Sequence, residues 1–410
     1  MKTTTTSRVL ATTLVTALAG IGLTLPAAGA TGSALEPAVP PAHGISHGIS
    51  HGASQGTSHS RALQADVDAI MKTGTVAVVA RSTGPRGSRT ATAGVAETVT
   101  GEAARPGDRF RIASASKTFV ATVVLQLVGE GRLSLDDTVE DWLPGVVSGH
   151  GNDGGAITVR QLLQHTSGLF DYTGDFPALT GKAAYEAGRY TTWTPEQLVG
   201  IAMKHAPAFA PGDGWSYSNT NYILAGMIIE KATGRTWQQE VTARVIRPLG
   251  LRHTLAPTTD SRIPGRHLHG YSSFGEAGEP LDATEFNPSA AGAAGAMIST
   301  TADLTRFYQA LLGGRLLRPA ELTAMKTTVR APELDPGWAG ARYGLGLMEI
   351  PLSCGGSYYS HGGDIPGYTT RDGVSADGRR TVVLNATGDG SDDSTTQQTE
   401  NTLIDNELCE

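Results

Sequence analysis

The sequence has no basic tract, and its overall charge is negative. Its 410 residues include 32 lysines and arginines against 39 aspartates and glutamates, which gives a formal net charge of −7 at pH 7. Proteins that bind mainly nucleic acid carry a basic patch or stripe, so this composition argues against nucleic acid as a partner. The length is sufficient for one large domain or two ordinary domains with a sizeable core.

Cysteine is also scarce, since Cys354 and Cys409 are the two in the chain. In an oxidising compartment a single pair is most simply explained by one disulfide. Such a bond would join the end of the chain to the region around Cys354, and it would stabilise the fold by roughly 4 kcal/mol in the chain-entropy model. Two free thiols are the alternative.

Long apolar runs are absent outside the first 30 residues. There, Lys2 and Arg8 precede an apolar stretch over residues 9–25, and small residues follow at 28–30, a pattern typical of a secretory signal peptide. Residues 1–30 are therefore predicted to be removed, which leaves a secreted protein without a membrane span. A membrane anchor is the alternative, but threonine and glycine interrupt the stretch, and no other run approaches the length of a transmembrane helix.

Residues 31–60 have too little apolar mass to pack. They contain a Gly-Ile-Ser-His repeat and are predicted to form a disordered linker rich in histidine, glycine and serine. Two Gly-x-Ser-x-Gly matches fall inside the repeat, but a nucleophile elbow needs a strand before it and a helix after it. The histidines could chelate a metal loosely, although a spacer is the favoured interpretation. The folded domain is predicted over residues 61–410.

A serine and a lysine three residues apart stand at the start of a predicted buried helix. Ser114 and Lys117 precede residues 120–128, which are apolar nearly all round and are therefore expected in the core. Side chains at i and i+3 share one helix face, so the Lys117 amine can reach the Ser114 hydroxyl, which needs such a partner to act as a nucleophile. A capping serine followed by a first-turn lysine is the alternative.

Two further motifs follow later in the chain. Tyr217 and Asn219 lie in a short aromatic loop between a Pro-Gly turn and a predicted helix. His361 begins a glycine-rich stretch in which Gly362 and Gly363 allow the backbone to approach a ligand closely. Alone, each motif has an ordinary structural explanation, namely a buried tyrosine beside a capping residue and a glycine-rich turn.

Predicted strands lie near both ends of the folded region, and predicted helices fill its middle. The expected strands are residues 76–80, 90–96, 344–350, 367–375 and 380–386, and the expected helices are 62–71, 114–128, 159–163, 219–233, 301–312 and 396–408. This order predicts an α+β fold, in which one antiparallel sheet is flanked by helices and an all-helical insertion forms a second lobe. The cleft between the lobes is the natural place for an active site.

Taken together, the three motifs resemble a known set. In this order, Ser114-x-x-Lys117, Tyr217-x-Asn219 and His361-x-Gly363 are similar to the active-site motifs of the serine β-lactamase and penicillin-binding superfamily. The resemblance lies in the branch of class C β-lactamases, soluble serine D-alanyl-D-alanine carboxypeptidases, D-aminopeptidases and related esterases. Residues 157–169 and 298–304 also resemble that branch. The greatest likeness is to the secreted D-alanyl-D-alanine carboxypeptidases.

The resemblance implies an acyl-enzyme mechanism that needs no metal and no cofactor. Ser114 is the expected nucleophile. Tyr217 is the expected general base, with its pKa lowered by positive charge on Lys117 and His361. Asn219 is expected to orient Lys117 and the substrate amide.

The same resemblance assigns the oxyanion hole to the backbone N–H groups of the nucleophile and of Asp364, beside Gly362 and Gly363. It also extends to a C-terminal disulfide, at Cys354 and Cys409. The implied partners are small peptide, D-amino-acid or ester substrates, with β-lactams as acylating inhibitors. The sequence indicates no oligomeric state.

The substrate pocket departs from the carboxypeptidase pattern. Met348 replaces an arginine that holds the substrate carboxylate there, Gly362 and Asp364 replace threonines, and Ala290 replaces an aromatic wall. An ionised Asp364 would repel a carboxylate and favour a neutral or cationic group. D-Alanyl peptide hydrolysis is still the main expectation, because of the likeness over the whole chain. An esterase or a D-aminopeptidase or amidase of the same fold is the alternative, and a non-catalytic penicillin-binding-like module is a third.

Overall fold

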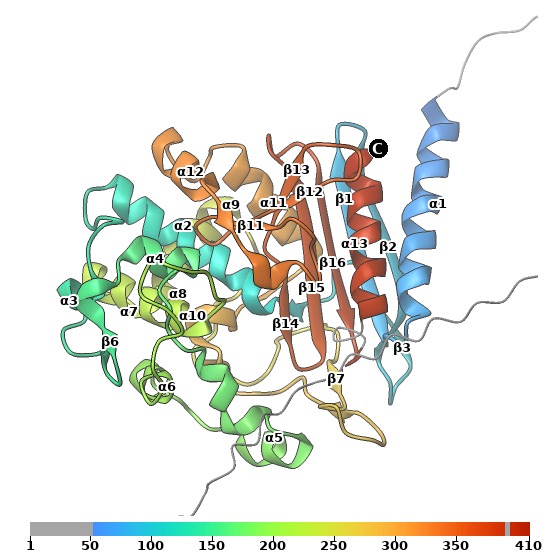
Figure 1. Ribbon diagram of the computed structural model, residues 1–410. Helices are drawn as coiled ribbons and strands as arrows, with labels where there is room; N and C mark the ends of the chain where they lie inside the picture. Colours follow the sequence, from blue (N-terminus) through green and yellow to red (C-terminus); the bar gives the residue numbers. More distant parts are fainter. Residues whose placement is uncertain (1–51, 390–393) are drawn as a thin grey trace, which may run out of the picture. The chain divides into compact units, whose positions relative to one another are not determined.

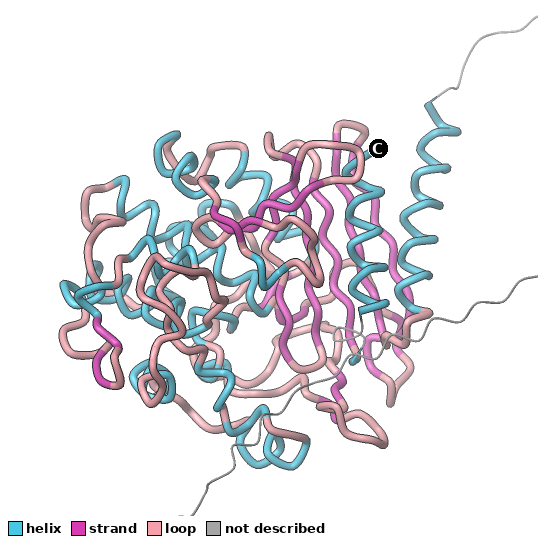
Figure 2. The backbone as a smooth tube through the Cα atoms, viewed as in Figure 1, coloured by secondary structure: helices cyan, strands magenta, loops and turns pink. Residues whose placement is uncertain are grey.

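The computed structural model describes residues 52–389 and 394–410, so the predicted signal peptide and most of the predicted linker lie outside the described residues. Within these residues, one part is a ten-stranded antiparallel sheet with helices on it, and the other is a largely helical lobe (Figures 1 and 2). The α+β architecture expected from the sequence is confirmed.

The sheet brings the two ends of the described chain together. Its strand order is β10-β11-β12-β13-β15-β16-β1-β2-β3, and β14 pairs with β15 beside this path. The strands are β1 (Ala77–Gly84), β2 (Gly87–Glu97), β3 (Glu102–Ala103), β10 (Val329–Arg330), β11 (Arg342–Tyr343), β12 (Met348–Pro351), β13 (Ser357–Ser360), β14 (Gly363–Ile365), β15 (Tyr368–Ser375) and β16 (Thr381–Thr387). β1 pairs with β16 from Ala77 opposite Thr387 to Thr83 opposite Thr381. The N-terminal hairpin and the C-terminal strands therefore form one continuous sheet.

Helices cover both faces of this sheet. α1 (Gly52–Met71) and α13 (Ser394–Cys409) pack side by side on one face, and α11 (Thr301–Leu312) packs against the central strands from the other (Figure 1). Alternate residues of β1 accordingly join two different hydrophobic cores: Val79 belongs to the core that includes Phe307 of α11, and Val78 belongs to the core that includes Leu403 of α13. Because both faces are covered, every residue of β16 is buried.

The helical lobe is built mainly from residues between β3 and β10. Besides α11, its helices are α2 (Ser116–Gly129), α3 (Val139–Trp142), α4 (Val159–Gln164), α5 (Lys182–Gly188), α6 (Pro195–Ala202), α7 (Asn219–Thr233), α8 (Trp237–Val241), α9 (Arg247–Leu249), α10 (Gly292–Gly295) and α12 (Pro319–Lys326). Short pairs join β4 (Phe110–Arg111) to β9 (Ile298–Ser299), β5 (Ser148–Gly149) to β6 (Asn152–Asp153) and β7 (Tyr271–Ser272) to β8 (Leu281–Asp282).

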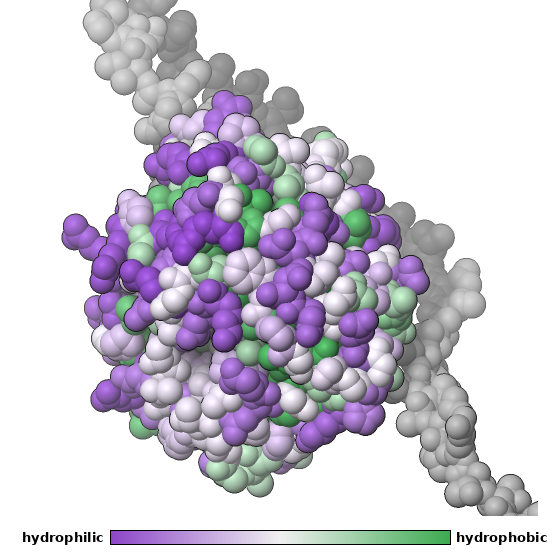
Figure 3. All heavy atoms as spheres, turned by 90° about the vertical axis from the view of Figure 1, so that its left-hand side faces the viewer, coloured by the Kyte–Doolittle hydropathy of each residue, from purple (hydrophilic) through white to green (hydrophobic). Residues whose placement is uncertain are grey.

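The two long helices α2 and α7 form the centre of this lobe. α2 is buried along most of its length, as its apolar sequence predicts, and α7 ends where Gly234 adopts a φ of +73°, a left-handed conformation that glycine adopts without strain. On the side of the lobe seen in Figure 3, hydrophilic residues and residues of intermediate hydropathy cover most of the surface, and hydrophobic residues form small separate areas. Within the described parts of the chain, no helix combines the length and the hydropathy that crossing a membrane requires.

Several boundaries differ from the predicted ones. α1 begins at Gly52 instead of near residue 62, so residues 52–60 of the predicted linker are helical, because a helix nucleated by packed residues extends at low cost. The strand expected at 344–350 starts only at Met348, because Gly346 adopts a φ of +73° and turns the chain. The stretch around His361, expected as a turn, contributes β13 and β14 on either side.

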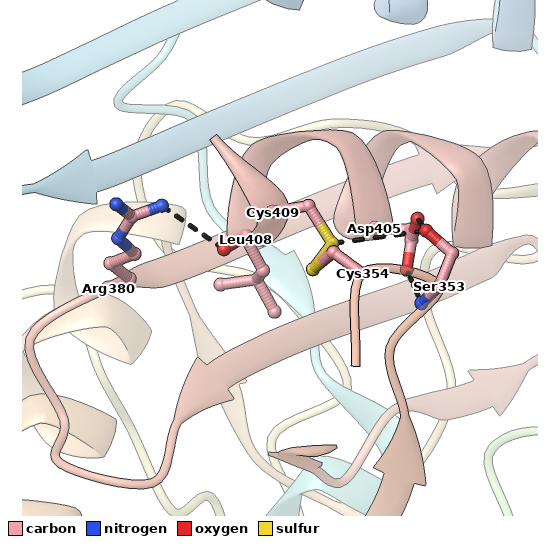
Figure 4. Close-up of a disulfide and its surroundings, with 6 residues drawn as sticks. All are labelled: Ser353, Cys354, Arg380, Asp405, Leu408 and Cys409. Carbon is pink, nitrogen blue, oxygen red and sulfur yellow. Dashed lines mark hydrogen bonds between the residues drawn. A yellow bond between two sulfur atoms is a disulfide. The ribbon is translucent and has the colours of Figure 1, made fainter. Parts of the chain in front are cut away.

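Cys354 and Cys409 form a disulfide, as predicted, with Cα atoms 5.9 Å apart. The bond joins the end of α13 to the loop between β12 and β13 (Figure 4). Beside it, the Ser353 N–H donates to Asp405 Oδ1 at 2.9 Å, and Arg380 Nη1 donates to the carbonyl of the residue before Cys409 at 3.1 Å. These contacts hold the last turns of α13 in a fixed position on the sheet.

Candidate active site

Ser114 lies in a tight turn that is held from behind. β4 leads into the 3₁₀ turn η1 (Ala113–Ala115), directly before α2. Ala113 adopts a φ of +46°, a left-handed conformation that costs on the order of 1 kcal/mol for a residue other than glycine. The buried Arg111 ties β4 to the neighbouring loop, because its Nε donates to the Thr284 carbonyl at 2.9 Å. The Ser114 hydroxyl is thereby presented at a fixed place.

The Lys117 amine is buried and makes three polar contacts. Its Nζ lies 3.0 Å from Ser114 Oγ, 2.7 Å from Asn219 Oδ1 and 2.8 Å from the Ala294 carbonyl oxygen. Burial lowers the pKa of Lys117 to about 7, and the negative charge of Asp171 offsets part of this effect. A neutral amine would donate its two N–H bonds to Asn219 and Ala294, which leaves its lone pair facing the Ser114 hydroxyl.

Tyr217 and Asn219 approach Ser114 from the start of α7. Asn219 Nδ2 donates to Asp171 Oδ2 at 2.9 Å, which turns the amide oxygen toward Lys117. The Tyr217 side chain interacts with that of Ser114, and its ring centroid lies 4.9 Å from Lys117 Nζ. Burial raises the pKa of Tyr217 well above the usual value for a phenol. The expectation of a lowered tyrosine pKa is therefore wrong, and Tyr217 is a neutral phenol.

His361 is buried against Tyr343. Its Nε2 lies 2.7 Å from the Tyr343 hydroxyl, its backbone N–H donates to Asp372 Oδ1 at 2.9 Å, and its ring centroid is 6.4 Å from that of Tyr217. Burial lowers the pKa of His361 to about 3, and the charge on Lys117 adds to this effect. The imidazole is therefore neutral and cannot supply the positive charge expected from the sequence. Its contacts instead fix the backbone of the third motif and the position of Tyr343.

β14 passes directly against the turn that carries the nucleophile. A Cβ atom added to Gly363 would lie 2.4 Å from the backbone nitrogen of Ser114 and 2.6 Å from the Ile112 carbonyl oxygen, which is closer than packed atoms allow. Only glycine fits at this position. The next residue, Asp364, lies on the same cavity wall as Ser114, so the stretch predicted to supply the second oxyanion N–H runs beside the first.

The substitution Gly363→Ala is expected to slow acylation of Ser114 by about 100-fold or more, because the added Cβ pushes β14 away and removes an oxyanion donor. The rate of fluorophosphonate labelling, followed by mass spectrometry, measures this effect. Gly200→Ala is the matched control, since Gly200 lies exposed on α6 with open space around its Cβ position. The control should label at the wild-type rate. A folded Gly363→Ala protein that also labels at that rate would contradict the role given to β14.

A cavity of about 210 Å³ opens beside Ser114. Most of its wall is apolar and consists of Tyr172, Phe176, Ala178, Leu179, Tyr185, Phe286, Ala290, Ala291, Ile365 and Pro366. Polar groups reach it from Asn219, Asp364, Thr173 and Arg189. Met348, the counterpart of the carboxylate-binding arginine, packs in the core of the sheet. An apolar cleft with a few converging polar groups is typical of a site for small molecules. Within residues 52–389 and 394–410, no group of three or more His, Cys, Asp or Glu side chains is placed to hold a metal.

Several residues of the site were not predicted from the sequence. His165 is buried and accepts the Ser218 N–H at 3.2 Å, and its ring packs at a tilt against that of Tyr217, with the centroids 4.3 Å apart. Asp171, which orients Asn219, lies just after residues 157–169, the stretch that resembles the family. Its place beside that stretch is the one feature of the sequence that could have pointed to it. Arg371 forms an ion pair with Asp364, and no motif in the sequence points to it.

Comparisons with known proteins agree with this geometry. A model of the beta-lactamase family matches residues 63–406. The structure of a D-stereospecific amidohydrolase from Streptomyces sp. is similar, with 45% identity, a TM-score of 0.78, and coverage of 85% of this chain and 98% of that one. A D-amino acid amidase from Ochrobactrum anthropi SV3, complexed with D-phenylalanine, is 29% identical, with a TM-score of 0.74 and coverage of 85% and 97%.

Among the curated relatives, Penicillin-binding protein 4* from Bacillus subtilis (strain 168) is 31% identical over 285 residues, or 67% of this chain. The chain spans only 59% of the length of that relative. The likeness to this relative therefore bears on the common domain and not on the rest of that protein. Because the family model spans nearly all of the described chain and the solved structures share its fold, this chain belongs to the beta-lactamase family and is a serine hydrolase of that fold.

Proposed function

We propose that this protein is a D-stereospecific amidohydrolase that cleaves amides of apolar D-amino acids with a free α-ammonium group, through an acyl-enzyme on Ser114. The Streptomyces and Ochrobactrum structures support this proposal, because both proteins are named for hydrolysis of D-configured amides. They favour the amidase alternative over the D-alanyl carboxypeptidase expected first from the sequence.

The position of Asp364 among the residues that line the cavity beside Ser114 is the observation that carries the proposal. Its side chain is 49% exposed, so it can be reached from the cleft. A carboxylate attracts an α-ammonium group and repels the terminal carboxylate of a D-alanyl-D-alanine peptide. A carboxypeptidase needs a positive charge in this region instead.

The aromatic and aliphatic wall supports an apolar substrate side chain. Tyr172, Phe176 and Phe286 offer ring surfaces beside Ser114, and aromatic surface binds apolar groups strongly. An ammonium group at Asp364, a carbonyl carbon at Ser114 and a side chain against these rings are three points of attachment. Three points distinguish the two enantiomers of an α-amino acid amide, which accounts for stereospecificity.

The contacts of Ser114 support a two-step reaction. The Ser114 oxygen attacks the amide carbonyl while its proton passes to the neutral Lys117 amine, directly or through the Tyr217 hydroxyl. The proton then moves to the departing nitrogen, which leaves as ammonia, and an ester of Ser114 remains. Water attacks this ester, the D-amino acid is released and the serine regains its proton. Backbone N–H groups of Ser114 and Asp364 would bind the oxyanion in both steps.

A D-alanyl carboxypeptidase is the second candidate, because Arg189 also lines the cavity. Its guanidinium could receive a substrate carboxylate in the cleft. The group is already engaged, however, since Nη1 donates to the Asp282 carbonyl at 2.9 Å and the guanidinium carbon lies 4.9 Å from the Tyr190 ring centroid. These contacts reduce what Arg189 can offer a substrate, and we therefore place this candidate second.

We also propose that the enzyme acts outside the cytoplasm. The N-terminal sequence has the pattern of a secretory signal. The disulfide between Cys354 and Cys409 supports this location, because such bonds persist in oxidising compartments.

The proposed function is tested by comparing kcat/KM for D-phenylalanine amide, L-phenylalanine amide and a D-alanyl-D-alanine peptide. The D-amide should be the best substrate. In Asp364→Asn, KM for this amide should rise roughly tenfold, the equivalent of 1.4 kcal/mol, while kcat stays within about threefold, because a charge-assisted contact to the ammonium group is lost.

Asp377→Asn is the matched control, because Asp377 is a half-exposed carboxylate paired with Arg379 in the turn between β15 and β16. It should leave KM unchanged. N-Acetyl-D-phenylalanine amide, which has no ammonium group, should bind wild type and Asp364→Asn equally. Preference for the D-alanyl-D-alanine peptide, or an unchanged KM in Asp364→Asn, would overturn the proposal.

A further inference from the structure

Behind the cleft, Asp364 is the outer member of a chain of three charged side chains. Arg371, on β15, lies with Nη1 2.9 Å from Asp364 Oδ1 and with Nε 3.2 Å from Glu400 Oε2. The Arg371 side chain is 3% exposed and that of Glu400 is fully buried. Glu400 comes from α13, which lies along β15 and β16 (Figure 1), so a residue near the end of the chain contacts the wall of the cleft through one arginine.

The three charges do not cancel. Asp364 and Arg371 alone would form a neutral pair and would offer little attraction to a cation. Above its pKa of about 7, Glu400 adds a second negative charge on the far side of Arg371, so the group then keeps one net negative charge. Asp372 is not part of this group. It belongs to the other face of β15, where it accepts hydrogen bonds from the His361 N–H and the Tyr308 hydroxyl.

Glu400 has little other reason to be buried. Neither of its carboxylate oxygens has a hydrogen-bond partner among the described residues, apart from the ion pair with Arg371. A buried ion pair is weak evidence for stabilisation, because desolvation offsets most of the attraction. Trp338 covers the pair, with its ring centroid 5.5 Å from the Arg371 guanidinium carbon, and a site shielded from water strengthens electrostatic effects. This arrangement suits Glu400 to a role in setting the net charge at the wall of the cleft.

The third motif is fitted to this arginine. A Cβ atom added to Gly362 would lie 2.8 Å from the Thr370 carbonyl oxygen and within 3.5 Å of Arg371 Cδ and Nη1. A threonine at this position, as in the carboxypeptidase pattern, would clash first with the Thr370 carbonyl oxygen, and its side chain would crowd Arg371. The two departures from that pattern, Gly362 and Asp364, therefore both belong to the contact with Arg371.

We propose that Glu400 is a positioning residue for substrate specificity: it holds and neutralises Arg371, and so leaves Asp364 with an unbalanced negative charge for the α-ammonium group of the substrate. This inference rests on the proposed function. Glu400 does not touch the substrate and acts through Arg371.

The test compares two inhibitors that differ only in the ammonium group, 1-amino-2-phenylethylboronic acid and 2-phenylethylboronic acid, each of which forms a reversible adduct with an active-site serine. The ratio of their dissociation constants reports the ammonium contribution. It is measured by calorimetry at pH 7.5, between the pKa of about 7 that burial gives Glu400 and the value of about 8 for an α-amino group. In Glu400→Gln the preference for the aminoboronic acid should fall by roughly tenfold, the equivalent of 1.4 kcal/mol.

A second variant separates charge balance from a general effect on the fold. Arg371→Met combined with Glu400→Gln removes both buried charges and restores one net negative charge on Asp364. Replacing a buried pair by neutral side chains is often tolerated. The double variant should keep the preference for the aminoboronic acid within about threefold of wild type. If the single variant does not fold, the double variant tests the proposal by itself. Loss of the preference in the double variant would overturn the charge-balance argument.

Glu407→Gln is the matched control. Glu407 lies on the same helix, is buried, and pairs with Arg89 at 2.5 Å, away from the cleft. It should leave the inhibitor ratio unchanged. A folded Glu400→Gln protein with an unchanged ratio, or with both inhibitors weakened equally, would overturn the inference. Inhibitor binding does not require turnover. A failure to hydrolyse D-amino acid amides would therefore count against the proposed function, but the inhibitor ratio would still test the role of Glu400.

Discussion

Replacement of Ser114 by alanine is expected to lower kcat for D-phenylalanine amide by at least about 10⁴-fold, and by as much as about 10⁶-fold, as the loss of a serine nucleophile does in other hydrolases. The hydroxyl is the atom that forms the acyl-enzyme, and neither the Lys117 amine nor the Tyr217 phenol can replace it at that position. Steady-state kinetics on purified protein measures the change. Folding should be retained, because alanine fills the turn without a new contact.

Labelling gives a second readout of the same prediction. A fluorophosphonate or a β-lactam should add one adduct to wild type on Ser114 and none to Ser114→Ala, as judged by mass spectrometry of the peptide over this turn. Ser116→Ala is the matched control, because Ser116 lies two residues along and is buried, with Oγ accepting the Met297 N–H at 3.1 Å. The control should lose about 1 kcal/mol of stability and keep the adduct. Activity of Ser114→Ala within tenfold of wild type would exclude Ser114 as the nucleophile.

Most of the fold and the centre of the site could be predicted because they depend on local pattern. The run after Lys117 is apolar on every side, which only a buried helix accommodates, and a lysine three residues after a serine must then share its face. The ends of α7 and α11 could be predicted because glycine, here Gly234 and Gly313, commonly terminates a helix. The disulfide followed from a cysteine count of two.

The charge states of the site could not be predicted, because they depend on burial. His361 and Lys117 are buried and Tyr217 is partly buried, and burial shifts each pKa toward the neutral form. A motif read from sequence gives neither the depth of a side chain nor its partners, so the imidazole was expected to carry a charge that it does not have. Lys117, taken as an electrostatic helper, becomes the group whose pKa matches a general base.

The partner of Asp364 could not be predicted from the sequence, for a different reason. Arg371 sits in a strand whose residues are all polar or small apart from Tyr368 and Val374, and Glu400 sits in a polar helix, so both resemble surface residues in the sequence. They are buried because α13 closes over β15, a contact between segments that no local period specifies. Contacts of this kind, which decide specificity here, appear only in the folded structure.

The substitution Lys117→Met is expected to lower kcat by about 10³-fold to 10⁴-fold, the upper range for loss of a general base. It also leaves the Asn219 and Ala294 oxygens without their donor, at a cost of roughly 1 to 3 kcal/mol in stability, so a melting curve accompanies the kinetics. Lys326→Met is the matched control, since Lys326 also donates to a carbonyl, that of Ala376 at 3.1 Å, away from the cleft. It should leave kcat unchanged.

The pH dependence of kcat distinguishes a base from a fixed positive charge at Lys117. Because burial lowers the pKa of Lys117 to about 7, the amine is protonated below that pH and can accept the serine proton only above it. The kcat for an ester of 3-phenylpropionate should therefore rise with pH through a single limb near 7, and the limb should be absent from the residual activity of Lys117→Met. This substrate lacks an ammonium group, and saturation removes effects on binding that involve Glu400. A wild-type kcat that falls as the pH rises through 7 would show that the ammonium form is the active one.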